Sequence, residues 1–235
     1  MLVDAKTDIG LLRQTNEDSY VCVDSKFYIV ADGMGGHVAG EVASNLVVDT
    51  VREFLYQAEL TGSVDENLLI KAITLANQVI FEKAEYDEQY KGMGTTISMA
   101  YFIENKCLWA HVGDSRIYIY RNHELSQITE DHSLVWNLVA SGSITEEEAA
   151  SHPQRNMLTR AVGVDADVEV DTGQLEIYKD DIFLLCSDGL TNMVDNEKIK
   201  ELIQTSAFNG IASKLIDTAL HAGGADNITA IIIKV

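Results

Sequence analysis

Four apolar runs that alternate like β-strands each border an aspartate, and this pattern constrains the fold more than any other feature of the chain. Asp32 follows FYIVA, Asp114 follows LWAHVG, Asp188 follows IFLLCS and Asp226 precedes NITAIIIKV. A carboxylate at the end of a buried strand is costly unless it is paired or coordinated, and converging carboxylates repel one another unless cations lie between them. The pattern therefore predicts four strands whose ends carry ligands for divalent cations.

The residue types around these aspartates favour magnesium or manganese over other metals. The ligands offered are oxygen atoms, and the chain has neither an HExxH motif nor a Cys/His cluster of the kind that binds zinc. Asp32 does not open a calcium loop, because Met34 and Gly36 occupy ligand positions and Ala43 stands where the closing Glu belongs. A single Asp-Gly pair is more often a turn than a ligand, but four aspartates at strand ends weaken that interpretation.

The hydrophobic pattern alternates between runs of strands and pairs of helices. Apolar residues recur at helical spacing in residues 38–54, 68–80, 196–204 and 210–222. Ser63 and Glu66 have the spacing of a capping box for the second helix. Because strands arrive in runs rather than alternating singly with helices, the order favours an α+β fold of antiparallel sheets covered by helix layers over a parallel βαβ sheet.

Residues 137–157 interrupt this regularity and are predicted to form a mobile flap subdomain. Thr145 and Glu148 form a capping signal for a short helix, and Pro153, the single proline, is expected to stop it. We find no linker, repeat or low-complexity segment elsewhere. Residues 1–235 are therefore predicted to form one catalytic domain that includes the flap.

Charge and cysteine usage exclude several classes of protein. The chain has 17 Lys and Arg against 37 Asp and Glu, and its formal net charge of −20 would repel nucleic acids and anionic lipids. It contains neither an apolar stretch of about 20 residues nor a hydrophobic signal core. Cys22, Cys107 and Cys186 are odd in number and lie in apolar runs, so we expect reduced thiols, a cytoplasmic location and no membrane segment.

Seven short motifs, in order along nearly the whole chain, resemble those of the PP2C-type (PPM family) metal-dependent protein Ser/Thr phosphatases. They are RQTNEDS (13–19), VADGMGGH (30–37), GMGTT (92–96), HVGDSR (111–116), TEDHSL (129–134), CSDGLT (186–191) and GGADNIT (223–229). The DGMGGH form is similar to bacterial members that oppose Hanks-type Ser/Thr kinases. The resemblance implies a four-layer α-β-β-α sandwich of two antiparallel sheets flanked by helix pairs, with a metal centre at one end of the cleft between the sheets.

The resemblance also implies a set of metal ligands for two core ions, Mn²⁺ or Mg²⁺. Asp32 would bridge both ions, and the carbonyl of Gly33 would bind one of them. Asp188 and Asp226 would complete the other. Two cations about 3.5–4 Å apart lower the pKa of a shared water and neutralise charge on the phosphoryl oxygens, so the ligand set would allow direct attack of water on phosphate.

Further residues around this centre have implied or expected roles. Glu17 and Asp18 would act on the metals through water, and Arg13 would hold the substrate phosphate with its two-pronged guanidinium. We expect Asp114, together with Asp188, to hold a third and weaker ion, because a carboxylate shared with another cation attracts an extra ion only loosely.

The histidines leave the general acid open. Many family members have His at the third position of the DGHGG motif, where this chain has Met34. His37 either donates the proton to the leaving group in its place or has a structural role beside the metals. His111 lies in a predicted strand, and we expect it to be a buried, hydrogen-bonded residue, while His132 is expected to form local hydrogen bonds at a helix start.

The predicted activity is hydrolysis of phosphoserine and phosphothreonine in proteins, with the phosphorylated proteins, a cognate Ser/Thr kinase among them, as partners. A monomer would suffice for this chemistry. Two alternatives remain open at this point: a non-catalytic regulatory module on the same fold, and a two-metal nuclease. The nuclease is the weaker of the two, because it would need a basic track for its polymer and the net charge is −20.

Overall fold

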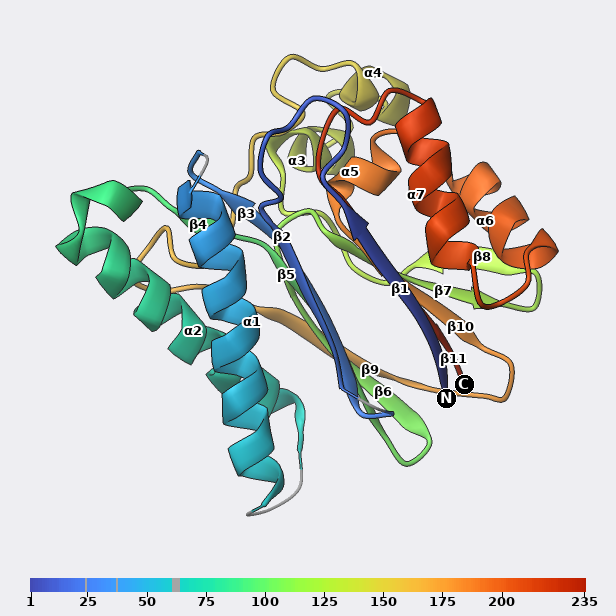
Figure 1. Cartoon of the computed structure of the whole chain (residues 1–235), viewed down its shortest axis with the longest axis horizontal. Helices are drawn as coiled ribbons and strands as arrows, with labels where there is room; N and C mark the ends of the chain where they lie inside the picture. The colour runs from blue at the N-terminus through green and yellow to red at the C-terminus, as the bar shows by residue number, and fades with distance from the viewer. Residues whose placement is uncertain (24, 37, 61–63) are drawn as a thin grey trace.

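Two antiparallel β-sheets form the centre of the molecule in the computed structural model, which describes residues 1–23, 25–36, 38–60 and 64–235 (Figure 1). The first sheet contains, in spatial order, β1 (Leu2–Asp8), β11 (Ile228–Lys234), β10 (Ile182–Cys186), β7 (Arg116–Arg121) and β8 (Glu124–Gln127). The second contains β2 (Asp18–Val23), β3 (Phe27–Met34), β5 (Ile97–Ile103), β6 (Lys106–Val112) and β9 (Asp171–Glu176), with the short β4 (Gly94–Thr95) paired to β3.

Helices cover the outer face of each sheet. The second sheet is covered by α1 (Val38–Glu59) and α2 (Glu66–Tyr86), which the one-turn η1 (Glu88–Tyr90) follows. The first sheet is covered by α5 (Asp188–Thr191), α6 (Asn196–Thr205) and α7 (Ile211–His221). Two further short helices, α3 (Leu134–Ala140) and α4 (Glu146–Ala150), lie beyond one end of the sheets, near α5 (Figure 1). The predicted four-layer α-β-β-α sandwich is thus the observed fold.

Strand β11 shows how the sequence produces these layers. Its side chains alternate between two cores: Ile231 and Ile233 point into the apolar layer between the sheets. Ala230 and Ile232 point instead toward the helices α6 and α7. Because both faces are covered, the strand is a continuous apolar run rather than an alternation of apolar and polar residues.

The start of α2 differs from the predicted capping box. Asp65 is the N-cap residue, and its side chain accepts a hydrogen bond from the backbone N–H of Leu68 at 2.9 Å. Ser63 lies outside the described residues. Ser and Asp are both favourable N-cap residues. An N-cap side chain accepts a hydrogen bond from the backbone N–H two or three residues later, and Leu68 lies three residues after Asp65.

The segment predicted to be a flap contains the short helix α4 and the last turn of α3. The capping box at α4 is confirmed, because the hydroxyl of Thr145 accepts from Glu148 N and the Glu148 carboxylate accepts from Thr145 N. Helix α4 ends at Ala150, before Pro153. Neither α3 nor α4 contains a buried residue. These helices therefore pack more loosely than the helix pairs that cover the sheets.

Two further observations bear on the sequence analysis. Cys22, Cys107 and Cys186 are free thiols, and the latter two are buried. None of the helices that the structure describes combines the length and apolar composition that a membrane crossing needs.

Candidate active site

Most of the predicted site residues line one small pocket of about 200 Å³, formed where β3, β6, β10 and β11 end or begin. The predicted residues in its wall are Arg13, Glu17, Asp32, Gly33, Asp114, Asp188 and Asp226. Asn156 and Leu158, which follow α4 in the chain, lie in the same wall. The four aspartates that border predicted strands therefore meet at one place, although Asp32 lies inside β3, since that strand continues to Met34.

Hydroxyl groups from the GMGTT motif hold the backbone of Asp32. Its N–H donates to Oγ1 of Thr96 at 2.9 Å, and its carbonyl accepts from Oγ1 of Thr95 at 2.9 Å. Thr96 Oγ1 is in turn 2.7 Å from Oγ of Ser115, the residue after Asp114. Thr96 thus links the backbone of Asp32 in β3 to the residue that follows Asp114.

Gly33 is a glycine because no side chain fits at its position. A Cβ there would collide with the carbonyl oxygen of Gly40, at the start of α1. It would also lie 2.7 Å from the carbonyl oxygen of Glu17, which accepts a hydrogen bond from Gly33 N at 3.0 Å. This close approach fixes the backbone of Gly33 at the wall of the pocket.

Asp18 lies behind the pocket, where it is buried against the first sheet. Its Oδ2 accepts hydrogen bonds from the hydroxyls of Ser187 at 2.7 Å and Thr229 at 2.6 Å. Its Oδ1 is buried and has no hydrogen-bond partner among the described residues. Burial raises the pKa of Asp18 to about 7, although the two hydroxyls oppose the shift, and repulsion from Asp188 adds to it.

The other carboxyls of the site are also unfavourable as bare anions. Burial, followed by repulsion from neighbouring aspartates, raises the pKa values of Asp32, Asp114 and Asp188. Asp188 Oδ2 accepts from Asn192 Nδ2 at 2.9 Å, while its Oδ1 is buried without a partner in the described part of the chain. Among described residues, no three His, Cys, Asp or Glu side chains are gathered tightly enough to form a complete metal cage by themselves.

Asn227 ties the loop before β2 to the loop before β11, a contact that the sequence analysis missed. Its Oδ1 accepts from Glu17 N at 2.8 Å, and its Nδ2 donates to the carbonyls of Ile9 at 2.9 Å and Thr15 at 3.0 Å. The side chain is buried. Each polar atom of this amide is therefore engaged, and the amide positions Glu17.

Arg13 is attached to the site through Asp226. Its Nη2 lies 2.7 Å from Oδ2 of Asp226, and its side chain remains 47% exposed. The guanidinium therefore combines an anchored nitrogen with a surface that faces solvent at the pocket. His37 lies outside the described residues, whereas Met34 lines the pocket.

His132 clamps the loop that carries Asp114. Its Nδ1 accepts from Gly113 N at 3.0 Å, and its own backbone N–H donates to Gly113 O at 2.7 Å. Because a backbone N–H can only donate, Nδ1 is the acceptor and the ring proton is on Nε2, which lies 3.1 Å from Asp171 Oδ2. Arg160 donates to the other oxygen of Asp171 at 2.6 Å.

His111 is buried beneath this clamp, as expected. Its ring is 4.8 Å from that of His132, measured between centroids, and its nitrogens lie 2.9 Å from Ser98 Oγ and 3.1 Å from Glu130 O. Burial, with a smaller contribution from His132, lowers the pKa of His111 to about 3. His111 is therefore neutral at physiological pH, and it lies away from the pocket wall.

The pocket thus brings carboxylates near the ends of strands from two sheets together with an arginine, and groups of these kinds suit a divalent cation and a phosphate. A family model described as "Protein phosphatase 2C" matches residues 13–222. The chain belongs to the protein phosphatase 2C family.

Several phosphatases are similar to this chain over its whole length. The serine/threonine phosphatase stp of Listeria monocytogenes is 41% identical over 241 residues, which cover 100% of this chain and 96% of the relative. The crystal structure of the Mycobacterium tuberculosis serine/threonine phosphatase PstP/Ppp superposes with a TM-score of 0.92 at 40% identity and covers 100% of this chain and 98% of that one. A structure of the PstP catalytic domain with two manganese ions has a TM-score of 0.89 at 38% identity, covering 98% and 96% of the two chains.

Proposed function

We propose that this protein hydrolyses phosphoserine and phosphothreonine in proteins with the help of two divalent cations. The observation that carries the proposal is the single pocket in which Asp32, Asp188 and Asp226 meet Arg13. Carboxylates attract cations, and an arginine beside them suits a phosphate dianion. Relatives named serine/threonine phosphatases, one with two manganese ions bound, support the same activity.

The residues present fit Mn²⁺ or Mg²⁺. Asp18 and Asp188 each have a buried carboxylate oxygen without a partner among the described residues, and burial, with repulsion between neighbouring aspartates, raises the pKa of both side chains. Magnesium keeps several waters and is usually bound by one or two carboxylates rather than by a complete protein cage. This preference suits a site whose carboxylates are spread around a pocket.

The proposed ligands follow from these positions. Asp32, the Gly33 carbonyl, Asp188 and Asp226 would hold the two core ions. Asp114 with Asp188 would hold a third, weaker ion. Bound cations of this kind lower the pKa of water and neutralise charge that develops on the phosphoryl oxygens.

The chain's own residues would position the reactants. Glu17 and Asp18 would orient water at the pocket, Asp18 through the carboxylate oxygen that has no partner in the described structure. Arg13 would bind the phosphate through the part of its guanidinium that faces solvent while Asp226 holds the other part. Met34 has no acidic proton, so His37 would either donate the proton to the leaving group or have a structural role beside the metals.

The biological setting belongs to the same proposal. The substrates would be phosphorylated Ser/Thr proteins, a cognate Ser/Thr kinase among them, and the protein would act as a cytoplasmic monomer. The three free thiols support a reducing compartment. Residues 137–157, within a single catalytic domain, would act as a flap that selects protein substrates, and Asn156, one of these residues, reaches the wall of the pocket.

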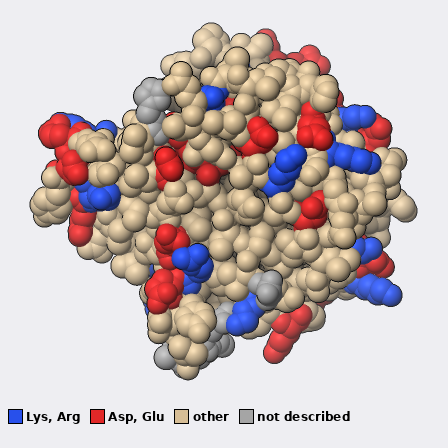
Figure 2. All heavy atoms as spheres, viewed as in Figure 1, with Lys and Arg blue, Asp and Glu red and all other residues tan. Residues whose placement is uncertain are grey.

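The two alternatives have less support. A nuclease needs a basic track, but on the face shown in Figure 2 the Lys and Arg side chains are scattered among acidic ones instead of forming one patch. A non-catalytic module would be expected to have lost metal-binding positions, whereas Asp32, Asp188 and Asp226 are all present in one pocket.

The decisive experiment measures phosphate release from a phosphothreonine peptide with Mn²⁺ and with a chelator. Turnover that requires the metal supports the proposal. Metal binding without turnover would favour the non-catalytic module, and cleavage of DNA or RNA at comparable rates would favour the nuclease.

A further inference from the structure

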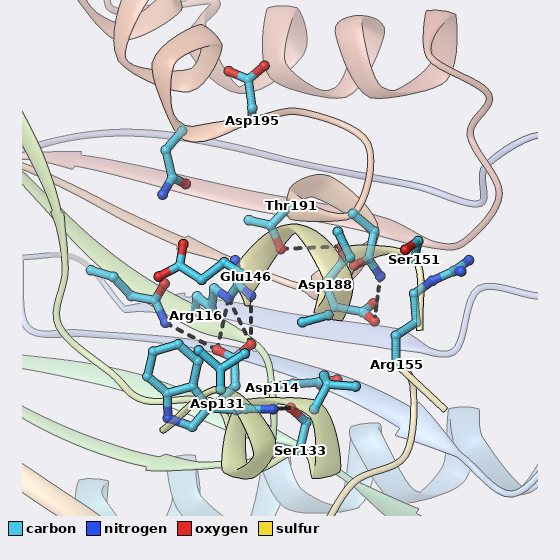
Figure 3. A pocket seen from close by; sticks show the side chains of 18 of the residues that line it. Asp114, Arg116, Asp131, Ser133, Glu146, Ser151, Arg155, Asp188, Thr191 and Asp195 are labelled. Atoms are coloured by element: carbon cyan, nitrogen blue, oxygen red, sulfur yellow. Dashed lines mark hydrogen bonds and ion pairs between the residues drawn. The ribbon is translucent and has the colours of Figure 1, made fainter. Parts of the chain in front are cut away.

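A second and larger cavity, of about 800 Å³, lies between the short helices α3 and α4 on one side and the segment from α5 to the start of α6 on the other (Figure 3). We call it the flap cavity. Its lining includes Arg116, Asp131, Trp136, Val139, Ala149 and Val194. It shares Asp114 and Asp188 with the catalytic pocket, so the two spaces are neighbours across these side chains.

The α3 wall of the flap cavity is apolar but not packed into a core. Helix α3 has the sequence LVWNLVA, in which six of seven residues are apolar, yet none of them is buried. Val135, Trp136 and Val139 line the cavity. When an apolar group of a ligand displaces water from half-exposed apolar side chains, apolar surface is removed from water and binding is favoured.

Two of the charged residues that line the flap cavity, Arg116 and Asp131, are paired with each other. Arg116 donates through Nε and Nη2 to both oxygens of Asp131 at 2.6–3.1 Å, and Gln127 donates to Asp131 Oδ1 at 3.1 Å (Figure 3). A charged ligand group entering there would lose its hydration without a free partner in this pair. An apolar side chain that packs on Val135, Trp136 and Val139 needs no such partner.

The position of the cavity indicates which molecule would supply that side chain. A substrate whose phosphorylated residue occupies the catalytic pocket would enter the flap cavity if its chain runs past the shared residues Asp114 and Asp188. In an extended peptide, side chains two residues apart point to the same face and are about 7 Å apart. The side chain two residues from the phosphorylated one is therefore the first that can reach the flap cavity.

We propose that the flap cavity binds an apolar side chain, such as Leu or Phe, located two residues from the phosphorylated Ser or Thr of the protein substrate. The inference rests on the function proposed above and adds a sequence preference to it. Trp136 and Val139 would contact this side chain from α3, and Val194 would contact it from the segment between α5 and α6.

The test compares phosphothreonine peptides that differ only in having Leu or Ala two residues before or two residues after the phosphorylated residue. The measured quantity is the ratio of kcat/KM for the Leu and Ala peptides, taken with one enzyme preparation so that general losses of activity cancel. We expect the unaltered enzyme to prefer Leu by about tenfold on one of the two sides.

If the flap cavity causes the preference for Leu over Ala, two different substitutions in its lining should remove that preference. Trp136→Ala deletes most of one wall, and Ala149→Phe fills the cavity from α4, so either should bring the Leu/Ala ratio toward one. Tyr86→Ala, at the exposed end of α2, is the matched aromatic control and should keep the ratio of the parent.

Binding can be followed without turnover, because Trp136 is one of only two tryptophans. In a Trp109→Phe background, an unphosphorylated Leu peptide should shift the fluorescence of Trp136, and the Ala peptide should shift it less. An equal response to both peptides would contradict the proposal.

Failure of this inference is distinguishable from failure of the proposed function. Peptides that are hydrolysed with Mn²⁺ at a Leu/Ala ratio near one on both sides would overturn the inference and leave the phosphatase activity intact. A preference that survives both Trp136→Ala and Ala149→Phe would place its origin elsewhere and would also overturn it. Absence of any metal-dependent hydrolysis would instead refute the proposed function, and the inference with it.

Discussion

Arg13 Nη2 and Asp226 Oδ2 are 2.7 Å apart, so a residue near the start of the chain forms an ion pair with one that is 213 positions away. The side chains are 47% and 25% exposed. Ion pairs that water can reach contribute little to stability, commonly less than about 1 kcal/mol. The pair therefore does more to orient the guanidinium at the pocket than to hold the fold together.

The first prediction concerns Arg13. Arg13→Ala should raise KM for a phosphopeptide about tenfold or more and lower kcat less, because hydrogen bonds from a charged group to phosphate contribute about 1.5–3 kcal/mol. Arg13→Lys should recover part of the affinity, since it keeps the charge and loses the two-pronged geometry. Steady-state kinetics tests this, and a large fall in kcat at unchanged KM would contradict it. Thermal unfolding should change little.

The second prediction concerns the proposed metal ligands. Asp32→Asn and Asp226→Ala should reduce metal-dependent hydrolysis to background, because each removes a carboxylate from a proposed cation site. Calorimetric titration with Mn²⁺ should show lost or weakened binding, while circular dichroism should show a folded protein. Without metal, Asp32→Asn should be at least as stable as the parent, since burial and repulsion raise the pKa of Asp32 and disfavour its anion. Asp49→Asn, on the exposed side of α1, is the control. Near-parental turnover in either variant would falsify the two-metal mechanism.

The third prediction is a pH dependence of stability that originates in His111. Its pKa is lowered to about 3 in the folded protein, whereas an unfolded His titrates near 6.5, so below that pH the unfolded chain binds a proton that the folded chain does not. This linkage makes the free energy of unfolding rise with pH between about 3 and 6.5. From pH 7.5 to 5.5 the parent should lose about 1.4 kcal/mol through this residue.

Denaturant unfolding at both pH values measures that loss. His111→Gln should be less stable at pH 7.5, because it disturbs a buried hydrogen-bonded site, but it should lose less stability on acidification. His123→Gln removes a histidine from the exposed turn between β7 and β8 and serves as the control. Equal pH slopes for His111→Gln and the parent would refute the assignment.

The fourth prediction separates the flap from the chemistry. Arg155 lies on the exposed segment after α4 and beside Asp188 at the flap cavity (Figure 3). Arg155→Ala should lower kcat/KM for a phosphoprotein several-fold more than for p-nitrophenyl phosphate, because Arg155 lines the flap cavity and not the catalytic pocket that the small aryl phosphate occupies. If both substrates suffered alike, residues 137–157 would be better described as structural support for the cleft.

The aspartates of the site could be predicted from the sequence because each borders an apolar run, and a run of this kind is a local signal. Ser187 and Thr229, the hydroxyl partners of Asp18, could not be predicted in the same way. They lie 169 and 211 residues from Asp18 along the chain and meet it only after the two sheets have packed. The Asn227 amide was missed for the same reason, because Glu17, whose backbone N–H it accepts, lies 210 residues away along the chain.

Strand β1 is the main element that the sequence did not reveal. It lies at the edge of the first sheet, and its seven residues, LVDAKTD, are half-buried or exposed. An edge strand with one covered side needs few apolar residues, so its pattern is weak. Its register is nevertheless continuous, from Leu2 opposite Lys234 to Asp8 opposite Ile228. Pairing with β11, a strand buried on both faces, supplies the order that its own composition does not.

The last prediction tests whether the His132 clamp positions Asp114. His132→Ala removes the acceptor for Gly113 N–H and leaves a buried donor unpaired, which should cost about 1–3 kcal/mol of stability. Because Asp114 follows Gly113, its carboxylate should be less well placed for a weak third ion. The His132→Ala variant should therefore need more Mn²⁺ to reach half of its maximal rate and should recover at high Mn²⁺.

Asp114→Ala should keep the two core ions and lose activity at any Mn²⁺ concentration, because the ligand itself is gone. Activity as a function of Mn²⁺, together with calorimetric counting of bound ions, distinguishes the two variants. If His132→Ala followed the metal dependence of the parent, the clamp would be purely structural. If Asp114→Ala bound the same number of ions and turned over at the same rate as the parent, the third site would have to be abandoned.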